Sequence, residues 1–400
     1  MHMSSSALLS RLQTLLPDQT PDPRIARDAL LRTVADLAIP DLEPDPRTIV
    51  ADLAHAGLLA HCVPGNDAVP GHELSIRTLC LLRCALSYRS PLYDLMFVMQ
   101  GLGSHAVGQA GSAQQRDEYL PRVASGQAIA ALALTEPEAG SDLSGIRTRA
   151  QKQADGRYRI DGEKVFISNA GLATHYVLYA RTGDHPKRGL SAFLLPADAP
   201  GVTTQPLRLI CDDHPIGRVL LHGVLLPDSA RIGEEGQGMS LDKGTFARFR
   251  TTVGAAAVGM AARALDEAVA HVRRRQQFGQ PLASFQATQL RVAEMATELR
   301  AAALLVWHAA QTLDLPAAIA PTETSARPHA EPASIESAMA KLFATETAQR
   351  VIDHALQLHG GSGLLSGSVI ERLYRDVRAL RIYEGTSEIQ KLIIARSVLS

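Results

Sequence analysis

The stretch ADGRYRIDGEKVFISNAG, residues 154–171, contains two short runs of β-forming residues, and each run follows an Asp-Gly pair. Asp-Gly is typical of tight hairpin turns because both residues tolerate the left-handed backbone conformation. We therefore expect hairpins at Asp155-Gly156 and at Asp161-Gly162. Similar runs follow one another from about residue 128 to 234 with no long helix between them, which predicts an antiparallel β-domain.

Helical sequence flanks this β-region on both sides. Before it, Ala- and Leu-rich segments are separated by breaks that prolines mark. After it, apolar residues recur at spacings of three and four over 258–272 and 292–306, and again over 339–358. A further helix is expected from about Thr386 to Leu399, and four long helices predict a bundle.

The predicted fold is therefore mainly α with a central β-domain. Residues 314–334 hold four prolines and no period, so we expect a loop between two helices there. The expected division is an N-terminal helical domain at 1–127, the β-domain at 128–235 and a C-terminal four-helix bundle at 236–400.

The composition excludes several classes of protein. The 40 Lys and Arg against 41 Asp and Glu give a net charge of −1, which argues against nucleic acid or an anionic membrane as the main partner. The four cysteines show no CxxC spacing, which indicates reduced core residues and no metal site. There is no apolar run of 18 residues and no signal peptide at the start, so we expect a cytoplasmic protein that does not enter a membrane.

Two motifs in the β-region carry polar groups at positions suited to a ligand. LALTEPEAGSD, residues 132–142, ends a predicted strand in a turn that offers backbone N–H groups and hydroxyls. It could equally be an ordinary β-turn that carries polar side chains. In KVFISNAG, residues 164–171, strand alternation places Phe166 and Ser168 on one face, which suits a flat heteroaromatic ligand. An aromatic residue in a strand is nevertheless more often part of the core.

Three motifs in the helical region are also ambiguous when each is taken alone. The arginines of HVRRRQQFG, residues 271–279, are typical of a solvated helix end. QLHGGSG, residues 357–363, is typical of a helix C-terminus, and its glycines would also let the backbone approach a pyrophosphate. RIYEGTSEIQK, residues 381–391, places a carboxylate on a glycine hinge before a helix.

Together and in this order, these motifs resemble the acyl-CoA dehydrogenase family, most specifically in TEPEAGSD and YEGTSEIQ. The resemblance runs from about residue 90 to 400 and more weakly before that. It implies FAD as cofactor, an acyl-CoA as substrate and an electron-transfer flavoprotein as acceptor. It also implies a homotetramer, a dimer of dimers, in which neighbouring subunits share the FAD sites.

The resemblance assigns roles to residues motif by motif. Thr135 and Ser168 would hydrogen-bond the flavin ring, and Phe166 would pack beside it. Ser141 would lie where the flavin and the CoA meet. The residues expected to bind FAD across a subunit interface are Arg275, Phe278, Gln286, Gln357, Gly360 and Gly361. Thr386 and Glu388 would contact its adenosine side.

Glu384 matches the catalytic base of the family. It would remove the α-proton of the acyl group while the β-carbon delivers hydride to flavin N5, which leaves a trans-2-enoyl-CoA. Gly385 beside it would leave room for the thioester, and Arg250 would contact the CoA. One branch of the family keeps its base directly before this arginine, but Phe249 stands there and cannot accept a proton.

The substrate and the oxidant stay open at this point. Bulky Phe246 and Phe249 favour a short, branched or alicyclic acyl group. One alternative is the same fold acting as an O2-using acyl-CoA oxidase or a flavin monooxygenase. Another is a flavin-bearing binding protein associated with DNA repair, against which the balanced charge argues.

Overall fold

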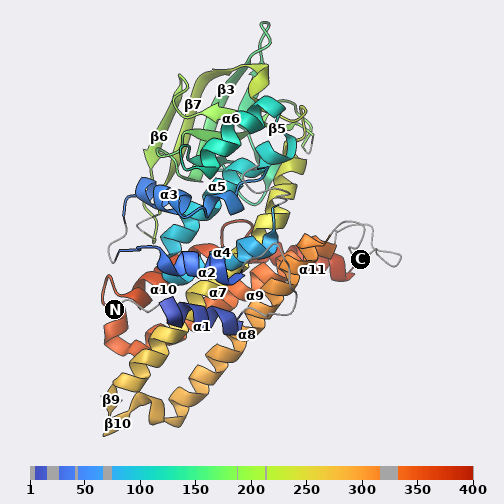
Figure 1. Ribbon diagram of the computed structural model, residues 1–400. Coiled ribbons are helices and arrows are strands. Elements are labelled where there is room, and N and C mark those ends of the chain that lie inside the picture. Colours follow the sequence, from blue (N-terminus) through green and yellow to red (C-terminus); the bar gives the residue numbers. More distant parts are fainter. Residues whose placement is uncertain are drawn as a thin grey trace. The chain divides into compact units, whose positions relative to one another are not determined.

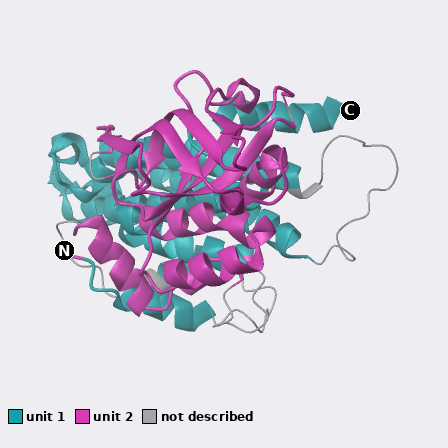
Figure 2. Ribbon diagram, turned by 90° about the horizontal axis from the view of Figure 1, so that it is seen from above, with its two compact units in different colours: residues 1–39, 76–94, 247–400 teal, residues 40–75, 95–246 magenta. Residues whose placement is uncertain are grey.

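A computed structural model describes residues 5–15, 27–40, 44–65, 74–186, 188–211, 214–315 and 332–399. The chain forms two compact units (Figure 2). Unit 1 consists of residues 1–39, 76–94 and 247–400, and unit 2 of residues 40–75 and 95–246. The boundary between residues 94 and 95 falls inside helix α5 (Pro91–Ala110), and the boundary between residues 246 and 247 falls inside helix α7 (Gly238–Arg274). The two units therefore divide the chain differently from the three expected domains, and the limits of those domains stay a prediction.

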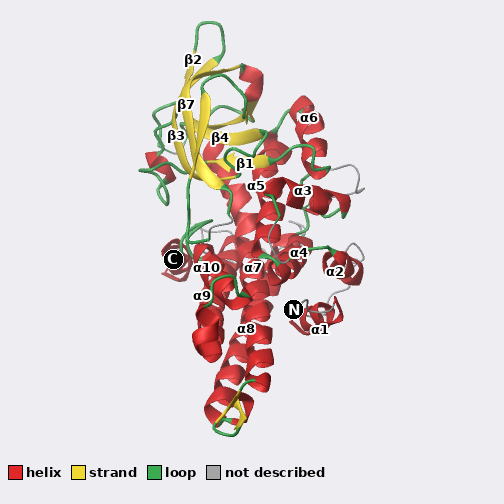
Figure 3. Cartoon of the chain, turned by 90° about the vertical axis from the view of Figure 1, so that its left-hand side faces the viewer, coloured by secondary structure: helices red, strands yellow, loops and turns green. Residues whose placement is uncertain are grey.

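Unit 2 contains a sheet of eight strands among its described residues (Figure 3). The strands are β1 (Ala130–Ala133), β2 (Arg149–Lys152), β3 (Tyr158–Ser168), β4 (His175–Arg181), β5 (Leu190–Pro196), β6 (Val202–Pro206), β7 (Ile216–Leu226) and β8 (Arg231–Ile232). Their order is β6-β7-β3-β2-β4-β5-β8, and β1 pairs with β4.

Two details of this sheet correct the expectations from sequence. The sheet is mixed and not purely antiparallel, because β1 and β2 each run parallel to β4. Only the first Asp-Gly pair forms a hairpin: Gly156 has φ +84° in the turn between β2 and β3. Asp161-Gly162 lies inside β3, at an irregularity in its register with β7. A Cβ atom at position 162 would lie 2.5 Å from Thr148 Oγ1. The glycine therefore allows the backbone of β3 to lie close to Thr148.

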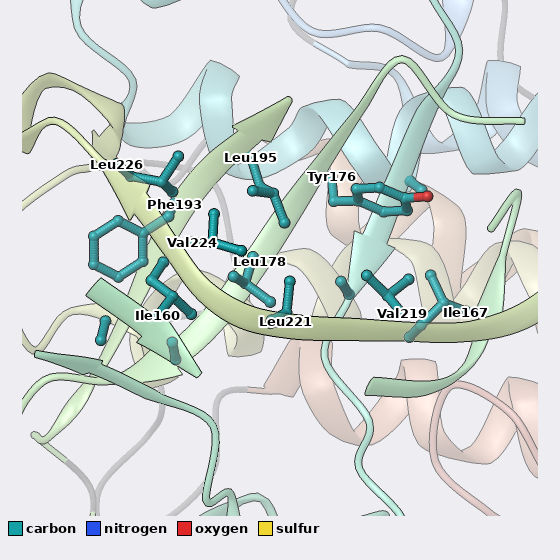
Figure 4. Close-up of a cluster of buried hydrophobic side chains, with 14 of the residues drawn as sticks. Ile160, Ile167, Tyr176, Leu178, Phe193, Leu195, Val219, Leu221, Val224 and Leu226 are labelled. Carbon is teal, nitrogen blue, oxygen red and sulfur yellow. The ribbon is translucent and has the colours of Figure 1, made fainter. Parts of the chain in front are cut away.

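One cluster of buried apolar side chains in unit 2 comes mainly from strands β1, β2, β3, β4, β5 and β7 (Figure 4). Tyr158 and Phe193 pack edge to face with ring centroids 5.1 Å apart. Each large apolar side chain buried here contributes about 1.5–3 kcal/mol relative to exposure. Every side chain of β4 is buried, which gives the continuous burial typical of a central strand.

The helices of unit 2 are α3 (Pro46–His55), most of α5 (Pro91–Ala110) and α6 (Ala113–Ala124). Sequence signals mark their ends clearly. Asp45 caps α3 directly before Pro46 at the first helical position. Ser112 and Gln115 form a capping box at the start of α6, which satisfies two backbone N–H groups.

Unit 1 is helical (Figure 1). Its helices are α1 (Ser5–Leu15), α2 (Arg27–Asp36), α4 (Ile76–Arg89), most of α7 (Gly238–Arg274), α8 (Gln286–Asp314), α9 (Pro332–His359), α10 (Val369–Leu380) and α11 (Ser387–Leu399). Helix α9 packs along α8 and also contacts α10 and α11. The short helix α10 was not expected from the sequence. Most of the expected loop at 314–334 lies outside the described residues.

A two-stranded hairpin, β9 (Gln276–Gln277) and β10 (Gln280–Pro281), joins α7 to α8. Among the described helices, none has the length and apolar character that a membrane crossing requires. All four cysteines are buried thiols, as expected.

Candidate active site

The hinge between α10 and α11 holds a buried carboxylate. Glu384 is 9% exposed and has φ +52°, and Gly385 follows with φ +87°. Within the described part of the chain, neither carboxylate oxygen of Glu384 has a hydrogen-bond partner. A buried polar group without a partner costs free energy, so this carboxylate is arranged for something other than stability.

The surroundings of Glu384 act on its pKa in opposite directions. Burial raises the pKa above its usual value, and this effect is the largest; Arg83, Lys341 and Arg250 lower it, and Asp94 raises it further. The pKa is raised on balance, towards the range in which a carboxylate serves as a general base. Phe249, directly before Arg250, is buried, and its phenyl ring has no atom that could accept a proton in place of Glu384.

Two buried side chains hold the hinge, one from a distant helix and one from the end of the motif itself. Lys341 Nζ, on α9, donates a hydrogen bond of 2.7 Å to the Gly385 carbonyl oxygen. Gln390 Nε2, on α11, donates to the same oxygen at 2.8 Å. The sequence analysis missed both residues. For Gln390 the signal was its place in YEGTSEIQ, whereas Lys341 carries no local signal.

Thr386 and Glu388 begin α11. Thr386 Oγ1 accepts a hydrogen bond of 3.4 Å from the Ile389 N–H. Hydrogen bonds from its own backbone N–H and from the Thr386 hydroxyl lower the pKa of the Glu388 carboxyl group. In the structure both residues therefore cap the helix, and a further role towards adenosine stays a prediction.

In unit 2, the motifs TEPEAGSD and KVFISNAG lie side by side. The Val165 N–H donates to the Thr135 carbonyl oxygen at 2.9 Å, which places Thr135 beside β3. Phe166 is 58% exposed and has φ +57° at a register shift of β3 against β7. Ile167 is buried, Phe166 is exposed and Ser168 is partly buried. The left-handed backbone at Phe166 interrupts the regular strand alternation, so the shared face of Phe166 and Ser168 stays a prediction. A bulky residue in this backbone conformation, with its ring exposed, indicates a functional constraint.

A buried ion pair anchors the TEPEAGSD turn to β3. Lys164 Nζ lies 2.8 Å from Glu136 Oε1 and 2.9 Å from the Leu134 carbonyl oxygen. The two oxygens of Glu136 also accept hydrogen bonds from the N–H groups of Arg147 and Thr148. Burial raises the pKa of Glu136, but Lys164 and these donors outweigh it and lower the pKa on balance. Glu136 therefore shapes the turn and does not face a ligand, a role that the sequence analysis missed.

Ser168 has a histidine neighbour that the sequence analysis also missed. Its hydroxyl lies 2.8 Å from His214 Nε2. Burial lowers the pKa of His214 to about 4, so the imidazole is neutral near pH 7. Ser141 is exposed at the end of the turn, where Asp142 accepts a hydrogen bond from the Ser144 N–H.

The remaining predicted FAD residues lie on the surface of unit 1. The imidazole rings of His271 and His359 are 4.3 Å apart, which brings the ends of α7 and α9 together. Phe278 is 93% exposed and has φ +50°. The other exposed members of the set are Arg275, Gln286, Gln357, Gly360 and Gly361. Such exposure agrees with groups that face another molecule.

The described residues contain no group of three or more potential metal ligands. The arrangement instead offers a buried carboxylate in unit 1 and an exposed aromatic ring with neighbouring hydroxyls in unit 2. Such groups suit proton removal and the binding of a planar heteroaromatic cofactor.

Comparison with known proteins gives a consistent result along the chain. Models of the N-terminal, middle and C-terminal domains of acyl-CoA dehydrogenases match residues 24–127, 131–224 and 236–399. The chain is 38% identical over 302 residues to a probable acyl-CoA dehydrogenase of Bacillus subtilis, with 74% of this chain and 76% of the relative covered. It is 37% identical over 367 residues to benzylmalonyl-CoA dehydrogenase of Aromatoleum aromaticum, with 91% and 92% covered.

Another relative is a subunit of the caffeyl-CoA reductase-Etf complex of Acetobacterium woodii, 31% identical over 389 residues, with 94% of this chain and 97% of the relative covered. Among solved structures, butyryl-CoA dehydrogenase from Megasphaera elsdenii superposes with a TM-score of 0.82 at 26% identity, covering 100% of this chain and 99% of that one. An acyl-CoA dehydrogenase from Bacillus anthracis complexed with FAD gives 0.83 at 26% identity, covering 100% and 71%. On these matches, the chain belongs to the acyl-CoA dehydrogenase family.

Proposed function

We propose that this protein is an FAD-dependent acyl-CoA dehydrogenase that converts an acyl-CoA to the trans-2-enoyl-CoA, with Glu384 as the base. The observation that carries the proposal is the buried Glu384 carboxylate, whose oxygens have no hydrogen-bond partner within the described residues. A base must keep its lone pairs available for the proton that it removes, and a raised pKa suits that task.

In the proposed reaction, the α-carbon gives a proton to a Glu384 oxygen, and the electron pair of that bond forms the new C=C bond. FAD, when bound, accepts the β-hydrogen as hydride, which balances the two electrons removed. Arg250 contacts the CoA, and Gly385 leaves space for the thioester. Arg250 lies near enough to Glu384 to affect its pKa, which supports a common site for the two residues.

The residues of unit 2 fit a flavin. Phe166 presents an exposed ring, Ser168 lies two residues further along β3, and Thr135 lies beside β3. Ser141 is exposed at the end of the TEPEAGSD turn. In this proposal Phe166 packs beside the flavin ring, Thr135 and Ser168 hydrogen-bond it, and Ser141 lies where flavin and CoA meet.

The exposed residues around the β9–β10 hairpin, at the start of α8 and at the end of α9 bind the FAD of a neighbouring subunit in a homotetramer. The exposure of Phe278 supports this, because an apolar side chain held in a left-handed conformation gains little from facing water. Thr386 and Glu388 contact the adenosine side. An electron-transfer flavoprotein accepts the electrons, supported by the relative whose name places it in an Etf complex. The buried cysteine thiols support a cytoplasmic location.

A panel of acyl-CoA esters tests the proposal. The purified protein should carry flavin absorbance, and anaerobic mixing with a short, branched or alicyclic acyl-CoA should bleach it and release the 2-enoyl-CoA. Electron-transfer flavoprotein should then restore the absorbance much faster than air. No bleaching by any ester would contradict the proposal, and fast recovery in air alone would favour an oxidase.

A further inference from the structure

The hinge at residues 384–385 is held in a conformation that needs support. Glu384 has φ +52° and Gly385 has φ +87°, so two consecutive residues are left-handed. A left-handed residue other than glycine persists only where its surroundings fix it, and such strain concentrates at functional positions. The surroundings of the hinge therefore show which groups set the direction of the Glu384 side chain.

Those surroundings meet at one atom, the carbonyl oxygen of Gly385. It accepts hydrogen bonds from Lys341 Nζ at 2.7 Å and from Gln390 Nε2 at 2.8 Å. Both side chains are 0% exposed. A second tie lies just outside the hinge, where Glu346 accepts hydrogen bonds from Arg381 at 2.9 Å and from Ser387 at 2.6 Å.

A hydrogen bond alone does not explain a lysine at position 341. The Gly385 carbonyl oxygen accepts from both side chains, but a neutral amide such as that of Gln390 makes this bond without the cost of burying an ammonium group. Burial lowers the pKa of Lys341 to about 8, as expected for a charge removed from water, while Glu384 acts in the opposite direction. Near pH 7 the group is thus still mainly charged. A neutral side chain at position 341 would avoid the free-energy cost of burying a charge. The positive charge itself therefore has a function.

Each other charged group near Glu384 already has a partner or an assigned role. Arg83 is paired with Asp94 through two hydrogen bonds of 2.8 Å, so much of its charge is cancelled. Arg250 is assigned to the CoA in the function proposed above. Glu346, which raises the pKa of Lys341, is bound by Arg381 and Ser387, and Glu388 lies exposed on α11.

We propose that Lys341 is a positioning residue for Glu384, fixing the hinge through the Gly385 carbonyl and keeping the carboxylate ionised through its charge. Gln390 shares the first role only. This inference rests on the proposed function in naming Glu384 as the base, but the ionisation of Glu384 is measurable without substrate or turnover.

The test compares Lys341→Met with Gln390→Leu, with Lys391→Met as the matched control because Lys391 is an exposed lysine on α11. Infrared spectra recorded against pH, with the Glu384→Gln spectrum subtracted, report the titration of the Glu384 carboxyl group alone. Anaerobic flavin reduction by an acyl-CoA, followed over the same pH range, reports its consequence for the reaction.

Removing a neighbouring cation raises the pKa of a carboxyl group. In Lys341→Met we expect the titration midpoint of Glu384 to rise by about one pH unit or more, about tenfold in ionisation equilibrium. Flavin reduction below that midpoint should fall by a similar factor. In Gln390→Leu, reduction should slow with the midpoint unchanged, and Lys391→Met should resemble the wild type. Lys341→Gln keeps a donor without the charge, so it should shift the midpoint even if Lys341→Met fails to fold.

An unchanged midpoint in both Lys341 variants would overturn the inference, whatever happens to the rate. That result is distinct from failure of the proposed function, in which the wild type would titrate as described but no acyl-CoA would reduce its flavin.

Discussion

Glu384 occupies a backbone conformation that costs about 1–3 kcal/mol for a residue other than glycine. Gly385 takes the next left-handed position without that cost, because it has no Cβ. A Cβ at position 385 would lie 2.6 Å from Gln390 Nε2, the donor that binds its carbonyl oxygen. The glycine therefore serves both the turn and the close approach of Gln390.

Gly385→Ala should lower the free energy of unfolding by about 2–4 kcal/mol, combining left-handed strain with displacement of Gln390. Gly156→Ala is the matched control: its φ is +84° against +87°, but nothing lies within 4 Å of the added Cβ. It should lose only about 1–2 kcal/mol from the strain. Urea unfolding followed by circular dichroism measures both. Equal losses would mean that Gln390 does not restrain the hinge.

At the level of helices and strands, the packing of the TEPEAGSD turn against β3 depends on one buried pair. Lys164 is 0% exposed and Glu136 is 7% exposed, so neither charge is well hydrated. Breaking such a pair leaves a buried charge uncompensated, which typically costs about 3–5 kcal/mol. The same two segments carry Thr135, Phe166 and Ser168, so the pair also fixes the surface proposed to receive the flavin.

Lys164→Met should therefore lose about 3–5 kcal/mol of stability at pH 7 and retain less FAD after gel filtration. Arg149→Met is the control, because its ion pair with Asp184 is exposed and worth about 1 kcal/mol or less. The pKa of Glu136 is lowered in the folded state, so its contribution is present above the unfolded value and is lost as pH falls through the folded one. The stability gap between the wild type and Lys164→Met should shrink on acidification from pH 6 to 3. A constant gap would contradict this account of the pair.

Local patterns in the sequence predicted the helical and β-regions but not every detail of their arrangement. Asp155-Gly156 forms the expected hairpin, whereas Asp161-Gly162 does not, because pairing of β3 with β7 overrides the local turn preference. The signal for α10 was present, since Ile370, Leu373, Val377 and Leu380 are spaced three, four and three apart and are buried. Parallel pairing with β4 joins segments far apart in the chain, which local periodicity does not reveal.

The motifs identified Glu384 and its glycine, but not the groups around them. Lys341 precedes the hinge by more than forty positions, and a lysine in a helix ordinarily lies in water. Its burial and its bond to Gly385 emerge only when α9 packs against α11. Similarly, the motif assigned no role to Glu136, and its structural role emerges only from its buried partner Lys164.

For the whole assembly, the proposed sharing of FAD between subunits makes a specific prediction. Arg275 is exposed directly before β9, and Phe278 follows β9 in the turn of the hairpin. Arg275→Ala should reduce FAD content and shift the proposed tetramer towards smaller species, because in the proposed arrangement this residue contacts both the cofactor and the interface. Analytical ultracentrifugation and flavin absorbance measure the two effects, with Arg157→Ala on the β2–β3 turn as control. Unchanged FAD content and mass would contradict the shared site.

The most direct test of the whole account is the rate of flavin reduction in Glu384→Gln, measured by anaerobic stopped flow with an acyl-CoA that reduces the wild type. The amide preserves the size of the side chain but cannot take up the α-proton. We expect normal FAD content and at least a roughly 100-fold slower reduction, the lower end for loss of a general base, while Glu118→Gln, an exposed control on α6, stays at the wild-type rate. Rapid reduction in the Glu384→Gln protein would contradict the assignment of Glu384 as the base.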